Sequence, residues 1–177
     1  MLSMIDPLKV FSTSRDMSGA NYYHIFNRGN RRAPIYRCVE DYVNFLNRLH
    51  EYAEREGVNV LAYCLMKNHY HFLLQQSSAD GISKLMRSLS ISYSKYFNWQ
   101  HREVGHLCQD KFKFRAVDNT NDLANLARYI HRNPILIDDP KMFRWSDLAQ
   151  YRQNVSTTLL EALNMTSEQY LDYVTKK

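Results

Sequence analysis

The sequence predicts an α+β protein built on a ferredoxin-like antiparallel sheet, with elements in the order β-α-β-β-α-β-α. Four short runs of aromatic, aliphatic and β-branched residues are typical of strands. Three other segments carry apolar residues at i, i+3, i+4 and i+7, the spacing of one helix face. Only two residues separate two of the strands, which favours an antiparallel hairpin. We expect the helices to pack on one face of this sheet and a helical extension to follow at the C-terminus.

The first strand is predicted over residues 21–27, which are rich in aromatic and β-branched side chains. It ends at the turn signal Arg28-Gly29-Asn30. The helix that follows carries its apolar stripe between Tyr42 and Ala53. Gly57 then stands where a glycine commonly ends a helix.

The second and third strands are predicted at residues 58–66 and 69–75, joined by a turn or bulge at Lys67-Asn68. A second helix follows, with its apolar stripe between Ile82 and Phe97. The fourth strand is predicted over residues 111–116, where apolar side chains alternate with cationic ones. We therefore expect one apolar and one cationic face on that strand.

Residues 21–134 are expected to form the main domain, preceded by an N-terminal segment over 1–20. Residues 135–177 are expected to form a helical extension that packs on this domain. Within it we predict a short helix over 145–151 and a last helix that begins with the capping box Thr166-x-x-Gln169.

The composition is that of a folded globular protein, because 45% of the 177 residues are hydrophobic. No run approaches the roughly 20 apolar residues of a membrane span, and the first 20 residues lack the apolar segment of a signal peptide. Cys38, Cys64 and Cys108 form no Cys-x-x-Cys pair. We therefore expect a reduced, cytoplasmic protein without a disulfide framework or a zinc knuckle.

The charge balance favours a polyanionic partner, with a formal net charge of +5 and a pI of about 9.1. Seven of the 23 lysine and arginine residues form two clusters within the main domain: Arg28, Arg31, Arg32 and Arg37, and Lys111, Lys113 and Arg115. Nucleic acid is the leading candidate partner. An ordinary solvated surface is the alternative for each cluster.

The most informative feature is the pair of histidines His69 and His71 inside an apolar run. On a strand, side chains two residues apart leave the same face, about 6.6 Å apart along the strand. Two neutral imidazoles at that spacing can bind one divalent cation. A structural role for the pair is the alternative, and the neighbouring helix decides between the two.

The third helix, capped by Thr120 and Asn121 and ending near Asn133, supplies candidates for a nucleophile and a third ligand. At 100° per residue, Tyr129 and Asn133 lie on the same flank of its apolar stripe. Tyrosine is a weak nucleophile at its free pKa of about 10, but a cation that polarises a phosphate makes it effective. His131 lies on the other flank and, like His24, has a structural interpretation of equal weight.

Four motifs now follow one another along the chain: Tyr23-His24-Ile25-Phe26-Asn27-Arg28-Gly29-Asn30, Ala62-Tyr63-Cys64-Leu65-Met66-x-Asn68-His69-x-His71, Gly105-His106-Leu107-x-Gln109-x-Lys111-Phe112, and Ala127-Arg128-Tyr129-Ile130-x-x-Asn133-Pro134. In this order and at these separations they resemble the REP-associated tyrosine transposases, which belong to the single-tyrosine HUH transposases. The resemblance covers roughly residues 20 to 151.

The resemblance implies a metal-dependent endonuclease and strand-transferase that cleaves single-stranded DNA through a covalent 5′-phosphotyrosine, at hairpin-forming repeats. Tyr129 matches the nucleophile of the family, and His69 and His71 match its metal-binding pair. Asn133 stands where relatives place a polar third ligand. The implied cofactor is Mg²⁺ or Mn²⁺.

The implied partner is single-stranded or hairpin DNA, with no membrane, and the chain is a monomer or a homodimer in a cytoplasmic, nucleoid-associated setting. The residues expected to contact DNA are Arg28, Asn30, Arg31, Arg32, Lys111, Lys113 and Arg115. Two alternatives stay open: a domesticated, non-catalytic DNA-binding protein of the same fold, and a metal phosphohydrolase that uses water in place of tyrosine.

Overall fold

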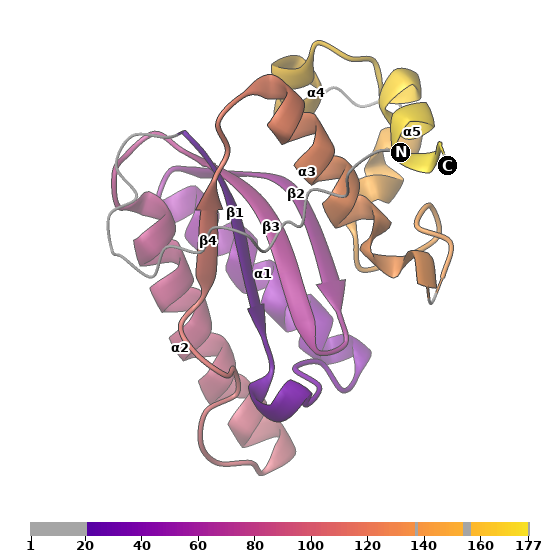
Figure 1. Cartoon of the computed structure of the whole chain (residues 1–177). Coiled ribbons are helices and arrows are strands. Elements are labelled where there is room, and N and C mark those ends of the chain that lie inside the picture. Colours follow the sequence, from indigo (N-terminus) through magenta and orange to yellow (C-terminus); the bar gives the residue numbers. More distant parts are fainter. Residues whose placement is uncertain (1–20, 137, 154–156, 177) are drawn as a thin grey trace.

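A four-stranded antiparallel sheet in the order β2-β3-β1-β4 forms the centre of the protein (Figure 1). The structure is a computed structural model that describes residues 21–136, 138–153 and 157–176. The N-terminal segment expected over residues 1–20 therefore lies outside the described residues. The strands are β1 (Tyr22–Arg28), β2 (Val58–Met66), β3 (His69–Gln76) and β4 (Lys113–Ala116).

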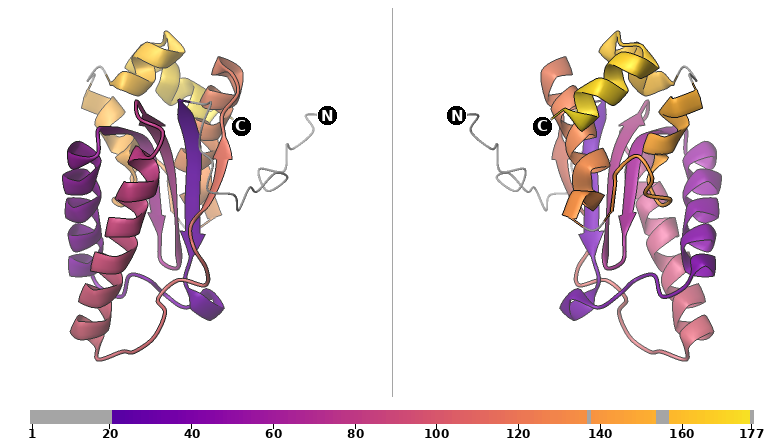
Figure 2. Two further views of the ribbon diagram at one scale, coloured as in Figure 1. Left: turned by 90° about the vertical axis from the view of Figure 1, so that its left-hand side faces the viewer. Right: turned by 90° about the vertical axis from the view of Figure 1, so that its right-hand side faces the viewer.

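Helices cover both faces of this sheet. α1 (Val39–Arg55) and α2 (Gly81–His101) pack together on one face, while α3 (Thr120–Arg132) crosses the other (Figure 2). The predicted fold class is confirmed. One detail differs, because the expectation of helices on one face holds for α1 and α2 but not for α3. The central strands explain this, since they are apolar on both sides and each side needs a cover.

The face under α1 and α2 holds an aromatic core. Tyr70 and Phe72 of β3 stack on each other with ring centroids 4.6 Å apart, and Phe45 of α1 packs against both. Leu89 of α2 closes the same core, and these four side chains are at most 3% exposed. Removing so much apolar surface from water provides the main stabilisation of this layer.

The opposite face of the same strands is covered by α3 and by the C-terminal helices. Leu73 of β3 and Ala62 of β2 pack in one core with Leu126, Ala127 and Ile130 of α3. Three further elements complete this layer: η3 (Asp147–Gln153), α4 (Thr158–Leu163) and α5 (Ser167–Thr175). The division of the chain into a main domain and an extension stays a prediction.

The predicted signals at the helix ends hold with small shifts. Gly57 adopts φ +63° just after α1, a left-handed conformation that favours glycine. Asn119 caps α3 by accepting from the Asp122 backbone N–H, one residue before the expected caps. The capping box of Thr166 and Gln169 is present at the start of α5. The short helix α4 was not anticipated from the sequence.

Candidate functional site

The sheet face under α3 brings three histidines together. On β3, His71 lies opposite Phe26 of β1, and His24 lies next to it on the same face, opposite Leu73. His69 opens β3 directly after the hairpin turn. Because side chains two residues apart share a face, His69 and His71 both point to the side that α3 crosses.

Both side chains that α3 was expected to supply lie over these histidines. The Tyr129 ring lies edge-on to His71 and His24, with centroids 5.5 and 6.1 Å away. Asn133 follows one turn later and keeps helical dihedral angles (φ −51°, ψ −38°) although a proline follows it. Tyr129 is 37% exposed, so its ring lies beside the buried histidines and still reaches solvent.

Each histidine of the pair is held through its Nδ1 atom. The Nδ1 of His69 lies 2.7 Å from the Asn68 side-chain oxygen, and the Nδ1 of His71 lies 3.0 Å from Nε2 of His24. The Nε2 of His69 faces the Asn133 side-chain oxygen at 3.2 Å. An imidazole held at Nδ1 by a neighbour, with Nε2 toward the site, is the usual arrangement of a metal-binding histidine.

Burial keeps these three imidazoles neutral. It is the main cause that lowers the pKa of His24 to about 3, with the nearby Arg115 guanidinium adding to the effect. Burial also lowers the pKa of His71 well below its usual value, helped by the two neighbouring histidines. The pKa of His69 is lowered by burial and, less, by Arg28. Neutral imidazoles are the form that binds metal ions.

His131, the other histidine of α3, serves a different purpose. It is fully buried and faces away from Tyr129, with Nδ1 2.8 Å from the Tyr170 hydroxyl and Nε2 2.8 Å from an Asp147 carboxylate oxygen. The same carboxylate oxygen accepts the backbone N–H of Tyr63 on β2. The network ties α3 to the C-terminal helices and to the sheet edge, so the structural interpretation of His131 holds.

The turn after β1 presents cationic side chains beside the histidine pair. Arg28 lies directly opposite His69 in the β1–β3 ladder and is exposed. Arg31 and Arg32 are exposed and adopt left-handed backbone conformations (φ 53° and 63°). A Cβ at Gly29 would lie 2.0 Å from a backbone oxygen, which explains why glycine is needed to fold this turn tightly.

The remaining residues expected to contact DNA differ in whether they already form an ion pair within the protein. Lys111 and Lys113 are exposed at the edge of the sheet. Arg115 forms a two-point ion pair with Asp122 of α3, with N–O distances of 2.7 and 2.9 Å. Its guanidinium therefore also anchors the helix that carries Tyr129. The last expected contact residue, Asn30, is exposed in the turn after β1.

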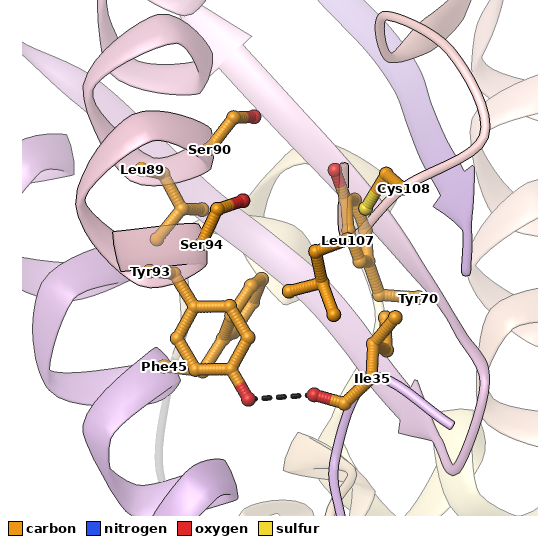
Figure 3. Close-up of a pocket in the computed structure, with 9 residues that line it drawn as sticks. All are labelled: Ile35, Phe45, Tyr70, Leu89, Ser90, Tyr93, Ser94, Leu107 and Cys108. Carbon is orange, nitrogen blue, oxygen red and sulfur yellow. Dashed lines mark hydrogen bonds between the residues drawn. The ribbon is translucent and has the colours of Figure 1, made fainter. Parts of the chain in front are cut away.

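One small cavity is separate from this face. A cavity of about 10 Å³ lies on the opposite side of the sheet, lined by apolar residues such as Leu89 and by Tyr93, whose hydroxyl donates to the Ile35 carbonyl (Figure 3). It has room for one water at most.

Among the described residues, no helix is both long and apolar enough to cross a bilayer.

Residues 18–133 match the sequence family described as "Transposase IS200 like". A comparison with curated proteins finds no match. Among solved structures, one of a REP-associated tyrosine transposase bound to a REP hairpin superposes with a TM-score of 0.62 and 18% identity, covering 76% of this chain and 80% of that one. The structure of a putative transposase from Deinococcus radiodurans R1 gives a TM-score of 0.47 and 17% identity, over 64% of this chain and 91% of that one. The first superposition agrees with the fold described above. Since the family match spans more than half of the chain, the chain belongs to the family of IS200-like transposases.

Proposed function

We propose that the protein is a metal-dependent single-stranded DNA endonuclease and strand-transferase that cleaves DNA through a covalent bond to Tyr129. One observation carries this proposal: the Tyr129 ring lies 5.5 Å from the ring of His71, on the sheet face that also holds His69, and Asn133 at the end of α3 contacts His69. A partly exposed tyrosine beside neutral imidazoles is an arrangement suited to attack on a phosphate. Membership of a transposase family agrees with this chemistry.

The donor atoms at the site fit a small divalent cation. When His69 donates from Nδ1 to Asn68, its Nε2 is an acceptor that faces the acceptor oxygen of Asn133 at 3.2 Å. Two facing acceptors are stabilised by a cation between them. His69, His71 and Asn133 would therefore hold Mg²⁺ or Mn²⁺, which polarises the scissile phosphate when bound.

His24 would select the form of His71 that binds metal. For Nε2 of His71 to serve as a ligand, its proton must sit on Nδ1 and be donated to Nε2 of His24. The proton of His24 then lies on its own Nδ1, a buried atom without a hydrogen-bond partner among the described residues. His24 is thus a positioning residue whose own hydrogen bonding is left incomplete.

The covalent step conserves the energy of the phosphodiester bond. The Tyr129 phenol loses its proton, and its oxygen forms a bond to phosphorus while the bond from phosphorus to the 3′ oxygen breaks. The leaving 3′ oxygen takes up a proton and becomes a free hydroxyl. Attack of a 3′-hydroxyl on the phosphotyrosine reverses the step and joins a new strand.

The DNA would lie along the cationic side chains that flank this face. Arg28 stands beside His69, and the exposed turn that follows it continues the positive surface. We assign phosphate contacts to Arg28, Asn30, Arg31, Arg32, Lys111, Lys113 and Arg115. At Arg115 a phosphate would compete with Asp122, which pairs with both terminal nitrogens of the guanidinium, and its Nε atom is buried. The hairpin bound by the structural relative favours hairpin-forming repeat DNA as the substrate.

We further propose a cytoplasmic, nucleoid-associated protein that acts as a monomer or homodimer.

The test is cleavage of labelled single-stranded hairpin DNA, analysed on denaturing gels. The wild-type protein with Mg²⁺ or Mn²⁺ is expected to give a protein-linked fragment, and Tyr129→Phe is expected to give none while it still binds the DNA. Free fragments without any protein-linked product would indicate the phosphohydrolase alternative. DNA binding without cleavage under all conditions would indicate the non-catalytic alternative.

A further inference from the structure

A second group of metal-binding side chains lies between the helices on the far side of the sheet. Cys38 and Asp41 stand at the start of α1, and His101 is the last residue of α2. One ligand atom from each lies within 4.8 Å of the other two. α1 and α2 cover the face opposite to α3, so this group is distinct from the histidine pair (Figure 2).

Asp41 is held rigidly at the centre of the group. Its side chain is fully buried, and one carboxylate oxygen accepts the backbone N–H groups of Arg37 and Cys38 at 2.7 and 3.2 Å. The Nε2 atom of His101 lies 3.0 and 2.9 Å from the two carboxylate oxygens. The carboxylate and imidazole thus face each other at hydrogen-bonding distance, so a cation between them would take the place of the shared proton.

Cys38 points its sulfur at the same place. Its side chain accepts the backbone N–H of Asp41, in a reciprocal cap of α1. Burial and the hydrogen bond with Glu40 raise the pKa of the Cys38 thiol despite this backbone N–H, so the metal itself would have to displace the thiol proton. Glu40 is exposed next to it, and its carboxylate lies within hydrogen-bonding reach of the Cys38 thiol. Glu40 does not belong to the group of three residues within mutual ligand distance.

We propose that Cys38, Asp41 and His101 form a zinc site, with a water in the fourth position, that joins the start of α1 to the end of α2. A sulfur, nitrogen and oxygen donor set favours Zn²⁺ over Mg²⁺. Zinc bonds of about 2.0 to 2.3 Å place tetrahedral ligands roughly 3.3 to 3.7 Å apart. The sulfur needs to move inward by about an ångström at most, which a side-chain rotation supplies. The site requires no Cys-x-x-Cys motif, since its ligands come from two helices.

The experiment measures zinc binding in the full-length protein with His69→Ala and His71→Ala, which removes the candidate catalytic ligands. We expect this background to bind one Zn²⁺ per chain. Adding Cys38→Ser should weaken binding at least 10-fold, whereas the matched control Cys108→Ser should leave it unchanged. Serine can still cap α1, so the helix is expected to remain. Co²⁺ in place of zinc should give cobalt–thiolate absorption that disappears with Cys38→Ser and remains with Cys108→Ser.

Thermal unfolding gives a second readout. Saturating zinc should raise the melting temperature of the background and of the Cys108→Ser control, but not that of Cys38→Ser or His101→Gln. If Cys38→Ser failed to fold, His101→Gln would provide the same comparison. Equal zinc affinity in Cys38→Ser and Cys108→Ser, or an absence of stoichiometric zinc in the background, would overturn the proposal and leave Asp41 and His101 as a structural hydrogen-bonded pair. The result is independent of the function proposed for Tyr129.

Discussion

The two faces of the sheet share the same strands but differ in chemistry. Under α1 and α2, Tyr70 and Phe72 belong to a core of aromatic and aliphatic side chains. Under α3, the neighbouring positions on the same strand are His69 and His71, and Tyr129 packs against His71. One face stabilises the sheet by burying apolar surface. The other face uses that rigidity to hold neutral imidazoles and the phenol of Tyr129, the proposed nucleophile, at fixed separations.

The histidine face also contains an interaction that destabilises the folded protein. Burial lowers the pKa of His24 and His71, and Nδ1 of His24 is buried without a hydrogen-bond partner among the described residues. An unsatisfied buried polar atom is destabilising and calls for an explanation. A role in orienting His71 as a ligand provides one.

The largest expected effect comes from the histidine face. His71→Ala should lower divalent-cation affinity and DNA cleavage by more than about 100-fold, because it removes a ligand and not merely its neighbour. The neighbouring Tyr70→Phe, whose side chain points to the opposite face, should leave cleavage within about twofold. Calorimetric Mn²⁺ titration and gel-based cleavage rates check both. Equal losses of cation affinity and cleavage in the two variants would contradict the placement of the metal site on the face under α3.

The aromatic face is expected to show the reverse pattern. Phe72→Ala removes a fully buried ring and should lower the free energy of unfolding by about 3 to 5 kcal/mol. Urea unfolding measures this change. At low temperature, the fraction that stays folded should retain its Mn²⁺ affinity, since none of the proposed ligands faces Phe72. Loss of Mn²⁺ binding by fully folded Phe72→Ala would contradict the prediction.

A smaller effect is expected from His131, on the side of α3 that faces away from Tyr129. His131→Ala removes the shared partner of Asp147 and Tyr170 and should lower the free energy of unfolding by about 2 to 3 kcal/mol. The rate of adduct formation should fall in the folded protein, because α3 loses its anchor, while Mn²⁺ affinity changes little. Combined unfolding and single-turnover cleavage measurements test this. An unchanged adduct rate would reduce His131 to a purely stabilising residue.

The smallest effect is a pH dependence of the metal-free protein. The lowered pKa of His24, about 3 when folded, means that between pH 6.5 and about 3 the unfolded chain binds a proton that the folded chain does not. Stability should therefore fall as the pH drops below 6.5, by up to roughly 1.4 kcal/mol per pH unit for this proton. His24→Gln should flatten the slope. Urea unfolding with a chelator from pH 7 to 5 measures it, and an unchanged slope would contradict the assignment.

Much of the fold followed from local pattern. The hydrophobic runs placed β2 at its observed bounds, and Gly57 marked the end of α1. The side of the sheet taken by α3 did not follow, because an apolar strand such as β3 does not show from its own sequence which helix covers which face. The short helix α4 has too few turns to show a periodicity.

The candidate site was predictable where spacing alone decides, as for His69 and His71 on one strand and for Tyr129 and Asn133 one turn apart. The sequence did not indicate that Asn68 contacts His69, and it left open whether His24 belongs to the site. Both contacts are made at an Nδ1 atom, and such a hydrogen bond depends on rotamers and on strand register. The group around Asp41 joins the two ends of separate helices and leaves no local motif.

The most direct measurement is the chemical identity of the covalent product. After reaction with single-stranded hairpin DNA and Mn²⁺, nuclease and protease digestion followed by mass spectrometry should find a nucleotide joined through its 5′-phosphate to the peptide that contains Tyr129. The modification should be absent when a chelator is added. A nucleotide on a different residue, or cleavage with no modified peptide at all, would contradict the account.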